Sequence, residues 1–472
     1  MSMDGKDICD KAIDMALGKG ANYAEARFEI SQNNQFVLKN GTPELGAFGR
    51  NAGIGLRVLV DGAMGFASFN SFDNKTLDAA LSEAIVLAKA SARLRKHPIV
   101  FSDERTSEKN YSIAGESADP EQKMNMLSEI DKSVASLPIP FRINLLFDSE
   151  TTRYYVNSDG SRIESYIPRL NFYSILTAVD PTRGTMEQAH YSLGASGGYE
   201  WVKKWDLYNL LEREVKILSR IVSEAKESPK GTIDFVVGSN VAGLIAHENC
   251  GHPSEADRIL GREAAQAGES YLSVDKLGDR IGSEFVTIID DPTMDGSYGY
   301  YLFDAEGIPA RPRHLIKNGI FHEMLHNRES AGFLETNSTG AARAGGFNRE
   351  PIPRMSCTYL DAGDFSFEEI FEDIKLGIYM KNHTEFNIDD RRFQSKYVGR
   401  EAYLIRDGVL TDELVKRPVL ESTTPDLFGS IDATSKKLHF DSALCGKGDP
   451  AQAIPVWHGG PEATRIRNVL VK

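Results

Sequence analysis

Two histidines and a glutamate lie together in the sequence HENCGH, which runs from His247 to His252. Imidazoles are common zinc ligands, and a neighbouring carboxylate can take a proton from the water that attacks a peptide bond. These residue types indicate a zinc hydrolase, with His247 and His252 as metal ligands and Glu248 as general base. The common zinc-peptidase signature places its histidines four residues apart, however, whereas these are five apart.

The five-residue spacing requires a distorted helix. Ser239 is a suitable N-cap, and the apolar residues within 241–245 predict a helix that leads into the motif. On a regular α-helix, residues five apart differ in direction by about 140°, against about 40° for residues four apart. Gly251 weakens a helix, and Pro253 disfavours helical geometry at the residue before it. We therefore expect a π-like turn or a bent junction that brings both imidazoles to one face.

A third protein ligand must come from elsewhere in the chain, because catalytic zinc sites usually have three. Cys445, in the segment ALCGKG, is the candidate, since the lysine two residues later favours a thiolate. Cys250 lies inside the motif, but on a continuing helix its thiol points away from the first histidine. Glu255 and Asp257 are candidates for the carboxylate that fixes the tautomer of a ligating imidazole.

A second segment, HEMLH from His322 to His326, matches the standard zinc-peptidase pattern letter for letter. Its context is a strand, because Asn318-Gly319 between two apolar runs predicts a hairpin. Residues four apart on a strand are separated by about 13 Å, too far to share one zinc ion. We interpret the match as coincidence and keep His326 as a candidate cleft residue that stabilises an oxyanion.

Composition and charge limit the classes of function. The 472 residues carry a net charge of −14, and without a basic run the chain is an unsuitable partner for nucleic acid. No stretch approaches the ~18 apolar residues that span a bilayer, and the N-terminus lacks the apolar core of a signal peptide. The four cysteines are too scattered for a disulfide framework. We expect a soluble cytoplasmic protein with no membrane partner.

The pattern of elements predicts an α+β protein in three parts. Residues 1–105 combine helical spacing with alternating strand runs and form a mixed N-terminal domain. Residues 106–228 form a central α+β domain, in which Asp119-Pro120 begins a helix. Residues 229–472 form a strand-rich C-terminal domain that carries the helix of the metal motif.

Several segments together resemble the TldD/PmbA family of metallopeptidases, the family labelled "modulator of DNA gyrase". HENCGHPSEAD resembles its H-E-x-x-x-H motif, DDPTMDGSYGYYLFDAEG resembles the signature that follows, and ALCGKG resembles its C-terminal Cys-Gly-Lys segment. The resemblance extends over essentially the whole chain. It implies zinc held by His247, His252 and Cys445, with Glu248 as general base. It also implies the catalytic, TldD-like branch, because the TldE/PmbA-like branch lacks the histidine motif.

The expected function is zinc-dependent hydrolysis of unfolded or extended peptides, whose main chain pairs with a strand edge of the C-terminal domain. The resemblance implies that this occurs inside a dimeric enclosure, either a homodimer or a heterodimer with a TldE/PmbA-like subunit. The alternative is a non-catalytic peptide-binding or scaffold subunit of such a complex, which has kept the motif but works through its partner.

Overall fold

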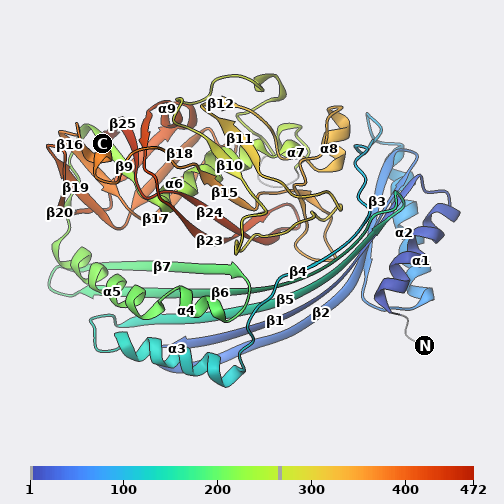
Figure 1. The fold of residues 1–472 in the computed structure, drawn as a ribbon, viewed down its shortest axis with the longest axis horizontal. Helices are drawn as coiled ribbons and strands as arrows, with labels where there is room; N and C mark the ends of the chain where they lie inside the picture. Colours follow the sequence, from blue (N-terminus) through green and yellow to red (C-terminus); the bar gives the residue numbers. More distant parts are fainter. Residues whose placement is uncertain (1–3, 264–267, 472) are drawn as a thin grey trace.

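The computed structural model describes residues 4–263 and 268–471 and confirms a mixed α+β protein (Figure 1). A long, curved sheet built from the first part of the chain lies beside a strand-rich C-terminal part. The C-terminal part carries the helix of the HENCGH motif, as the sequence predicts.

One seven-stranded sheet contains all the strands before residue 200 that the structure describes. Its order is β3-β2-β1-β5-β6-β4, with β7 paired to β6 as an edge strand. β1 pairs with β2 on one side and with β5 on the other, so strands from both sides of residue 105 share this sheet. The domain boundaries near residues 105 and 228 stay predictions. The strand bounds are β1 Tyr23–Lys39, β2 Thr42–Val60, β3 Ala63–Phe69, β4 Glu108–Ser112, β5 Phe141–Asn157, β6 Arg162–Asp180 and β7 Thr185–Ser196.

Helices cover the two ends of this sheet (Figure 1). At one end, α1 and α2 pack together against β1, β2 and β3, and at the other α3 and α5 pack together against β1, β6 and β7. The Asp119-Pro120 start is confirmed, because Asp119 caps α3 and forms a reciprocal capping box with Gln122. The helix bounds are α1 Gly5–Gly18, α2 Asn74–Ala92, α3 Pro120–Val134, α4 Glu200–Lys204 and α5 Leu207–Glu224.

The C-terminal part contains two larger sheets and two smaller ones. Their orders are β22-β25-β9-β16-β19-β20-β8, β12-β11-β10-β15-β24-β23, β17-β18-β21 and β13-β14. The first of these sheets has the strands β8 Lys226–Glu227, β9 Gly231–Val237, β16 Leu376–Met380, β19 Ala402–Arg406, β20 Val409–Lys416, β22 Ile431–Thr434 and β25 Thr464–Val471. The second has β10 Ile288–Asp290, β11 Arg313–Lys317, β12 Ile320–Phe321, β15 Cys357–Leu360, β23 Leu438–Lys447 and β24 Gln452–Pro461. The small sheets have β13 Ala342–Arg343, β14 Ile352–Pro353, β17 His383–Ile388, β18 Gln394–Gly399 and β21 Val419–Thr423.

Helix α6 (Ser239–Ile245) lies between the two larger C-terminal sheets. It contacts β9 of one sheet and β15, β23 and β24 of the other. Its apolar side chains join the core that both sheets share, and Gly243 allows a close approach to the backbone of His458 and Gly459. This packing holds the metal motif, which follows α6 directly, in a fixed position beside β23. The other helices of this part are α7 Ala256–Ile259, α8 Arg328–Phe333 and α9 Thr424–Gly429.

Within residues 4–263 and 268–471, none of the helices combines the length and the apolar character that crossing a bilayer would need.

Candidate metal centre

The helix of the HENCGH motif is distorted where the spacing requires it. α6 continues into a π-helical turn at Ala246–Gly251 and then into one 3₁₀ turn at His252–Ser254. A π turn is wider than an α turn, so residues five apart come to the same face. A Cβ at position 251 would lie 1.9 Å from Met355 Sδ, so a larger residue here requires the Met355 side chain to move. The predicted π-like turn is confirmed.

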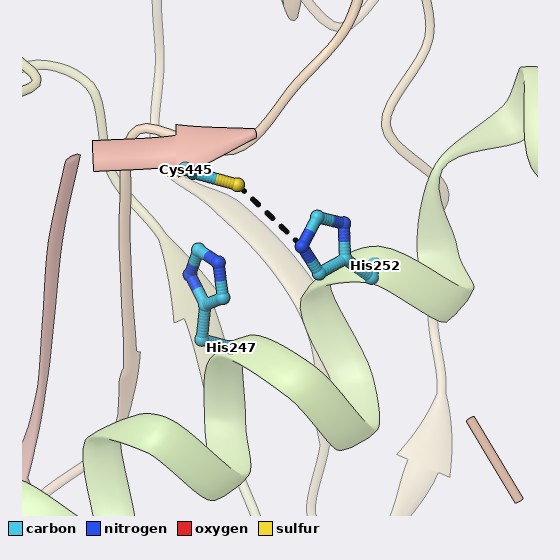
Figure 2. Close-up of side chains that lie close together, drawn as sticks. All are labelled: His247, His252 and Cys445. Carbon is cyan, nitrogen blue, oxygen red and sulfur yellow. Dashed lines mark hydrogen bonds between the residues drawn. The ribbon is translucent and has the colours of Figure 1, made fainter. Parts of the chain in front are cut away.

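The two histidines and Cys445 converge on one point (Figure 2). One potential ligand atom from each residue lies within 4.8 Å of the others, and all three side chains are buried. The two imidazole centroids are 4.9 Å apart, and Cys445 Sγ lies 3.5 Å from His252 Nε2. Cys445 reaches this point from β23, the last strand of its sheet. The structure therefore brings together the three residues that the sequence analysis selected as ligands.

The electrostatics of this cluster suit a cation. Burial opposes ionisation of the Cys445 thiol, but His252 and His247 outweigh burial and hold its pKa well below the usual range. Burial likewise disfavours a charged imidazole, yet Cys445 and Glu255 raise the pKa of His252 to about 9. Two imidazoles and a thiolate are a donor set that zinc favours, and three protein ligands leave one position open for water or substrate. The residues present thus fit a catalytic zinc ion.

A carboxylate fixes one of the two imidazoles. Glu255 Oε2 lies 3.0 Å from His252 Nδ1, which leaves Nε2 of the same ring facing Cys445. Lys447 lies 3.1 Å from Glu255 and donates a 2.7 Å hydrogen bond to Asp257 Oδ1. Burial opposes ionisation of Glu255, but Lys447 and His252 hold its pKa well below the usual range. Of the two carboxylates that the sequence suggested for this role, Glu255 contacts a histidine, and Asp257 acts only through Lys447.

Loss of the Glu255 charge should weaken metal binding more than loss of the Asp257 charge. We expect Glu255→Gln to lower zinc affinity by about 10–100-fold, the usual cost of removing a carboxylate partner of a ligating histidine. Asp257→Asn is the matched control, because it neutralises the other carboxylate on Lys447, and its effect should stay within about threefold. Competition with a fluorescent zinc chelator measures both affinities. Equal losses in the two variants would contradict the assignment of Glu255.

The other polar residues of the motif have separate roles. Glu248 lies within the π turn next to His247, lines the cavity described below, and forms an ion pair with Arg392 at 3.3 Å. Asn249 holds the π turn against β18 and α9, because its amide donates hydrogen bonds to Ser395 and Thr424. Cys250 is buried away from the cluster, and burial raises the pKa of its thiol.

The cluster lines a cavity of about 740 Å³. The described segments that surround this cavity together with the motif include β7 of the large N-terminal sheet, helix α5, β23, and the β17 strand with the loop that follows it. The cavity is large enough for several residues of a peptide, and each of these strands lies at the end of its sheet. His383, Arg392 and His458 also line it and were not identified from the sequence, because they are distant from the motif along the chain.

The HEMLH segment supports the site from behind and does not enter it, because Leu325 exchanges backbone hydrogen bonds with Ser254 and Ala256, just after the motif. The Asn318-Gly319 hairpin is present, with φ of 51° and 78° at the two turn residues, but the returning strand β12 ends at Phe321. His326 is buried and its Nδ1 lies 3.1 Å from Ser330 Oγ at the start of α8. Neither histidine of the segment lines the 740 Å³ cavity. The structure therefore does not bring His326 to the position of an oxyanion-stabilising group.

A distorted helix with two histidines and a glutamate, completed by a distant cysteine, defines a metallopeptidase site. The chain matches the PmbA/TldA metallopeptidase C-terminal domain over residues 230–472, domain 1 over 24–88 and the central domain over 114–228. It belongs to the PmbA/TldA family of metallopeptidases.

Relatives and solved structures cover almost the full chain. A metalloprotease of Methanocaldococcus jannaschii is 33% identical over 93% of this chain and 95% of its own length. A zinc metalloprotease, a TldD homologue of Saccharolobus solfataricus, is 26% identical over 96% and 97% of the two chains. The fold resembles a crystal structure from Thermotoga maritima titled as a modulator of a DNA gyrase (TM-score 0.77, 17% identity, covering 99% and 100%). It also resembles TldE from Thermococcus kodakarensis (TM-score 0.69, 17% identity, covering 98% and 99%).

Proposed function

We propose that this metallopeptidase is a zinc-dependent enzyme that hydrolyses peptide bonds in unfolded or extended polypeptides. The observation that carries the proposal is the convergence of His247, His252 and Cys445 beside Glu248, in a cavity surrounded by strand edges. The printed name of the Saccharolobus relative, a zinc metalloprotease, supports the choice of metal. The number and type of ligands support it independently, since thiolate with imidazole favours zinc over magnesium or calcium.

The proposed reaction divides the chemistry between the ion and Glu248. Zinc, when bound, supplies Lewis acidity that makes water more acidic and polarises the scissile carbonyl. Glu248 takes a proton from the attacking water and later delivers it to the nitrogen of the leaving amine. His247, His252 and Cys445 hold the ion at the cavity wall, while Glu255 keeps His252 in the tautomer whose Nε2 faces the site.

The strand edges support a preference for extended substrates. Ser442, near the middle of β23, contacts Ser192 of β7 at the cavity wall. The residues of β23 that follow, 443–446, also border the cavity, and Leu444 is 65% exposed. A peptide in extended conformation can pair with the main chain of such an edge, and this mode of binding depends little on side chains. We expect weak sequence preference and no cleavage of folded proteins. The assembly that encloses the substrate is, in this proposal, a homodimer or a heterodimer with a TldE/PmbA-like subunit.

Metal removal tests the proposed function. Purified protein should cleave a fluorogenic unstructured peptide, lose this activity in 1,10-phenanthroline, and regain it when stoichiometric zinc is added, because the ion supplies the Lewis acidity. The alternative, a non-catalytic peptide-binding subunit, predicts binding of the same peptide without cleavage in every metal state. Activity that persists after complete metal removal would contradict the proposal. The assay is run on the chain alone and on the complex co-purified from its host, so that a required partner is present in one of the two samples.

A further inference from the structure

One arginine of the cavity comes from a hairpin that is distant from the motif along the chain. Strands β17 and β18 are joined by residues 389–393, and Arg392 in this connection has a left-handed backbone with φ of 60°. The connection is fixed on both sides, because Arg392 N donates to Asp389 O and Arg392 O accepts from the Thr424 hydroxyl. Ten of the described non-glycine residues are left-handed, several of them in hairpin turns, so at Arg392 the conformation defines the turn that connects the two strands.

The Arg392 side chain extends into the metal-site cavity and contacts the proposed general base. Its Nη1 lies 3.3 Å from Glu248 Oε2, and the two side chains are only 14% and 11% exposed. Its Nε is buried and has no hydrogen-bond partner among the described residues. Glu248 Oε2 also lacks a hydrogen-bond partner among the described residues, so the contact with Arg392 is an ion pair and leaves donors of the guanidinium, which has five N–H groups, available for a substrate. The neighbouring Arg391 differs, since it is 63% exposed and pairs with Glu269 on the surface.

We infer that Arg392 is a catalytic residue that donates a hydrogen bond to the oxygen of the scissile carbonyl as negative charge develops there. The inference rests on the proposed peptidase function and adds the protein group that stabilises the oxyanion. A guanidinium suits this role because it stays charged, presents several donors in one plane, and can contact Glu248 and a substrate oxygen together.

The charge movement in the attack step favours a cation at this position. The water oxygen forms a bond to the carbonyl carbon, its proton passes to Glu248, and the π electron pair of the carbonyl moves onto the carbonyl oxygen. The negative charge is thereby transferred from the carboxylate of Glu248 to the substrate oxygen. A guanidinium next to both groups can stabilise the charge before and after this transfer, in a buried site where such contacts are strong.

Replacement of Arg392 tests the inference. Arg392→Gly removes the guanidinium, and glycine accepts the left-handed backbone without strain. We expect kcat to fall by about 10²–10³-fold, the usual cost of removing one oxyanion donor, while KM and bound zinc stay within about twofold of wild type. Guanidinium chloride at millimolar concentration should restore part of the lost kcat. Affinity for a phosphinic peptide, which mimics the tetrahedral state, should fall in parallel with kcat/KM.

Two further variants separate this role from simple charge pairing. Arg392→Lys keeps a positive charge for Glu248 but lacks the planar fork of donors that can contact Glu248 and a substrate oxygen together, so we expect kcat to remain at least tenfold below wild type. Arg391→Ala removes the adjacent surface arginine and should leave all constants unchanged. Wild-type activity in Arg392→Lys, or an Arg392→Gly protein that keeps phosphinic-peptide affinity, would overturn the inference. Failure of the proposed function would look different, because wild-type protein would then show no metal-dependent cleavage at all.

Discussion

Replacement of Cys445 by alanine should remove the bound metal and with it the peptidase activity, while the protein stays folded. Among residues 4–263 and 268–471, Cys445 is the one candidate ligand outside the HENCGH motif, and His252 and His247 hold the pKa of its thiol well below the usual range despite burial. Without it two imidazoles remain, which is too few for a catalytic zinc site. The loss of zinc affinity should exceed the loss of about 10–100-fold that we expect when Glu255, the carboxylate partner of a ligating histidine, is replaced. Inductively coupled plasma mass spectrometry of the purified protein measures the metal content.

Two control variants make this result specific. Cys250→Ala removes another buried thiol, one that belongs to the motif itself but lies outside the ligand cluster, and should retain stoichiometric zinc. His322→Ala removes the first histidine of the HEMLH segment and should retain both zinc and activity. A Cys445→Ala protein that still binds one zinc per chain would refute the ligand assignment. Loss of zinc in His322→Ala but not in Cys445→Ala would move the site to the second segment.

Replacement of Glu248 by glutamine should abolish most turnover without loss of metal. Glu248 is adjacent to His247 and lines the same cavity, but it is not one of the three converging ligands. A positioned general base contributes about 10²–10⁴-fold to the rate, and glutamine cannot accept the proton. We therefore expect kcat to fall within this range, while zinc content and KM change by less than about threefold. Steady-state kinetics on the fluorogenic peptide, together with metal analysis, measure the effect.

The HEMLH segment supplies a matched control for this variant. Glu323 occupies the equivalent position after His322 and pairs with Arg311 near the surface at 2.7 Å. Glu323→Gln should therefore leave kcat and zinc content unchanged. If Glu248→Gln keeps near-wild-type turnover, the proton passes through another group and the proposed mechanism is wrong. If zinc is lost together with activity, Glu248 is part of the metal-binding set instead.

The local geometry of the metal motif could be predicted from the sequence, because the causes lie within a few residues. The spacing of His247 and His252 excluded a regular helix, and Gly251 and Pro253 indicated where it would be distorted. The π turn confirms that prediction. The sequence indicated that Gly251 weakens the helix, but it could not show that Met355 packs against this position, because that contact depends on tertiary packing. The Asn-Gly turn correctly indicated a hairpin before HEMLH, but the prediction that His322 to His326 lie on the returning strand was wrong, because that strand ends at Phe321.

Long-range contributions were much harder to predict. Cys445 was identified from its thiol chemistry and from a family resemblance. Its spacing from the histidines carried no information, because 193 positions separate it from His252. Of Glu255 and Asp257, the sequence could not say which contacts a histidine, since this depends on the 3₁₀ turn that follows the π turn and on Lys447 of β23, which takes Asp257 as its partner. Arg392 had no sequence signal at all. It reaches Glu248 because β18 pairs with both β17 and β21, and the residues that connect β17 to β18 lie beside the motif.

X-ray absorption spectroscopy at the zinc edge tests the central claim most directly. The proposed zinc centre predicts one sulfur scatterer at about 2.3 Å and two imidazole nitrogens at about 2.0–2.1 Å, with a further light atom at the open position. The sulfur contribution should be absent from any zinc that binds to Cys445→Ala. A wild-type spectrum with nitrogen and oxygen scatterers alone would contradict a His247, His252 and Cys445 centre.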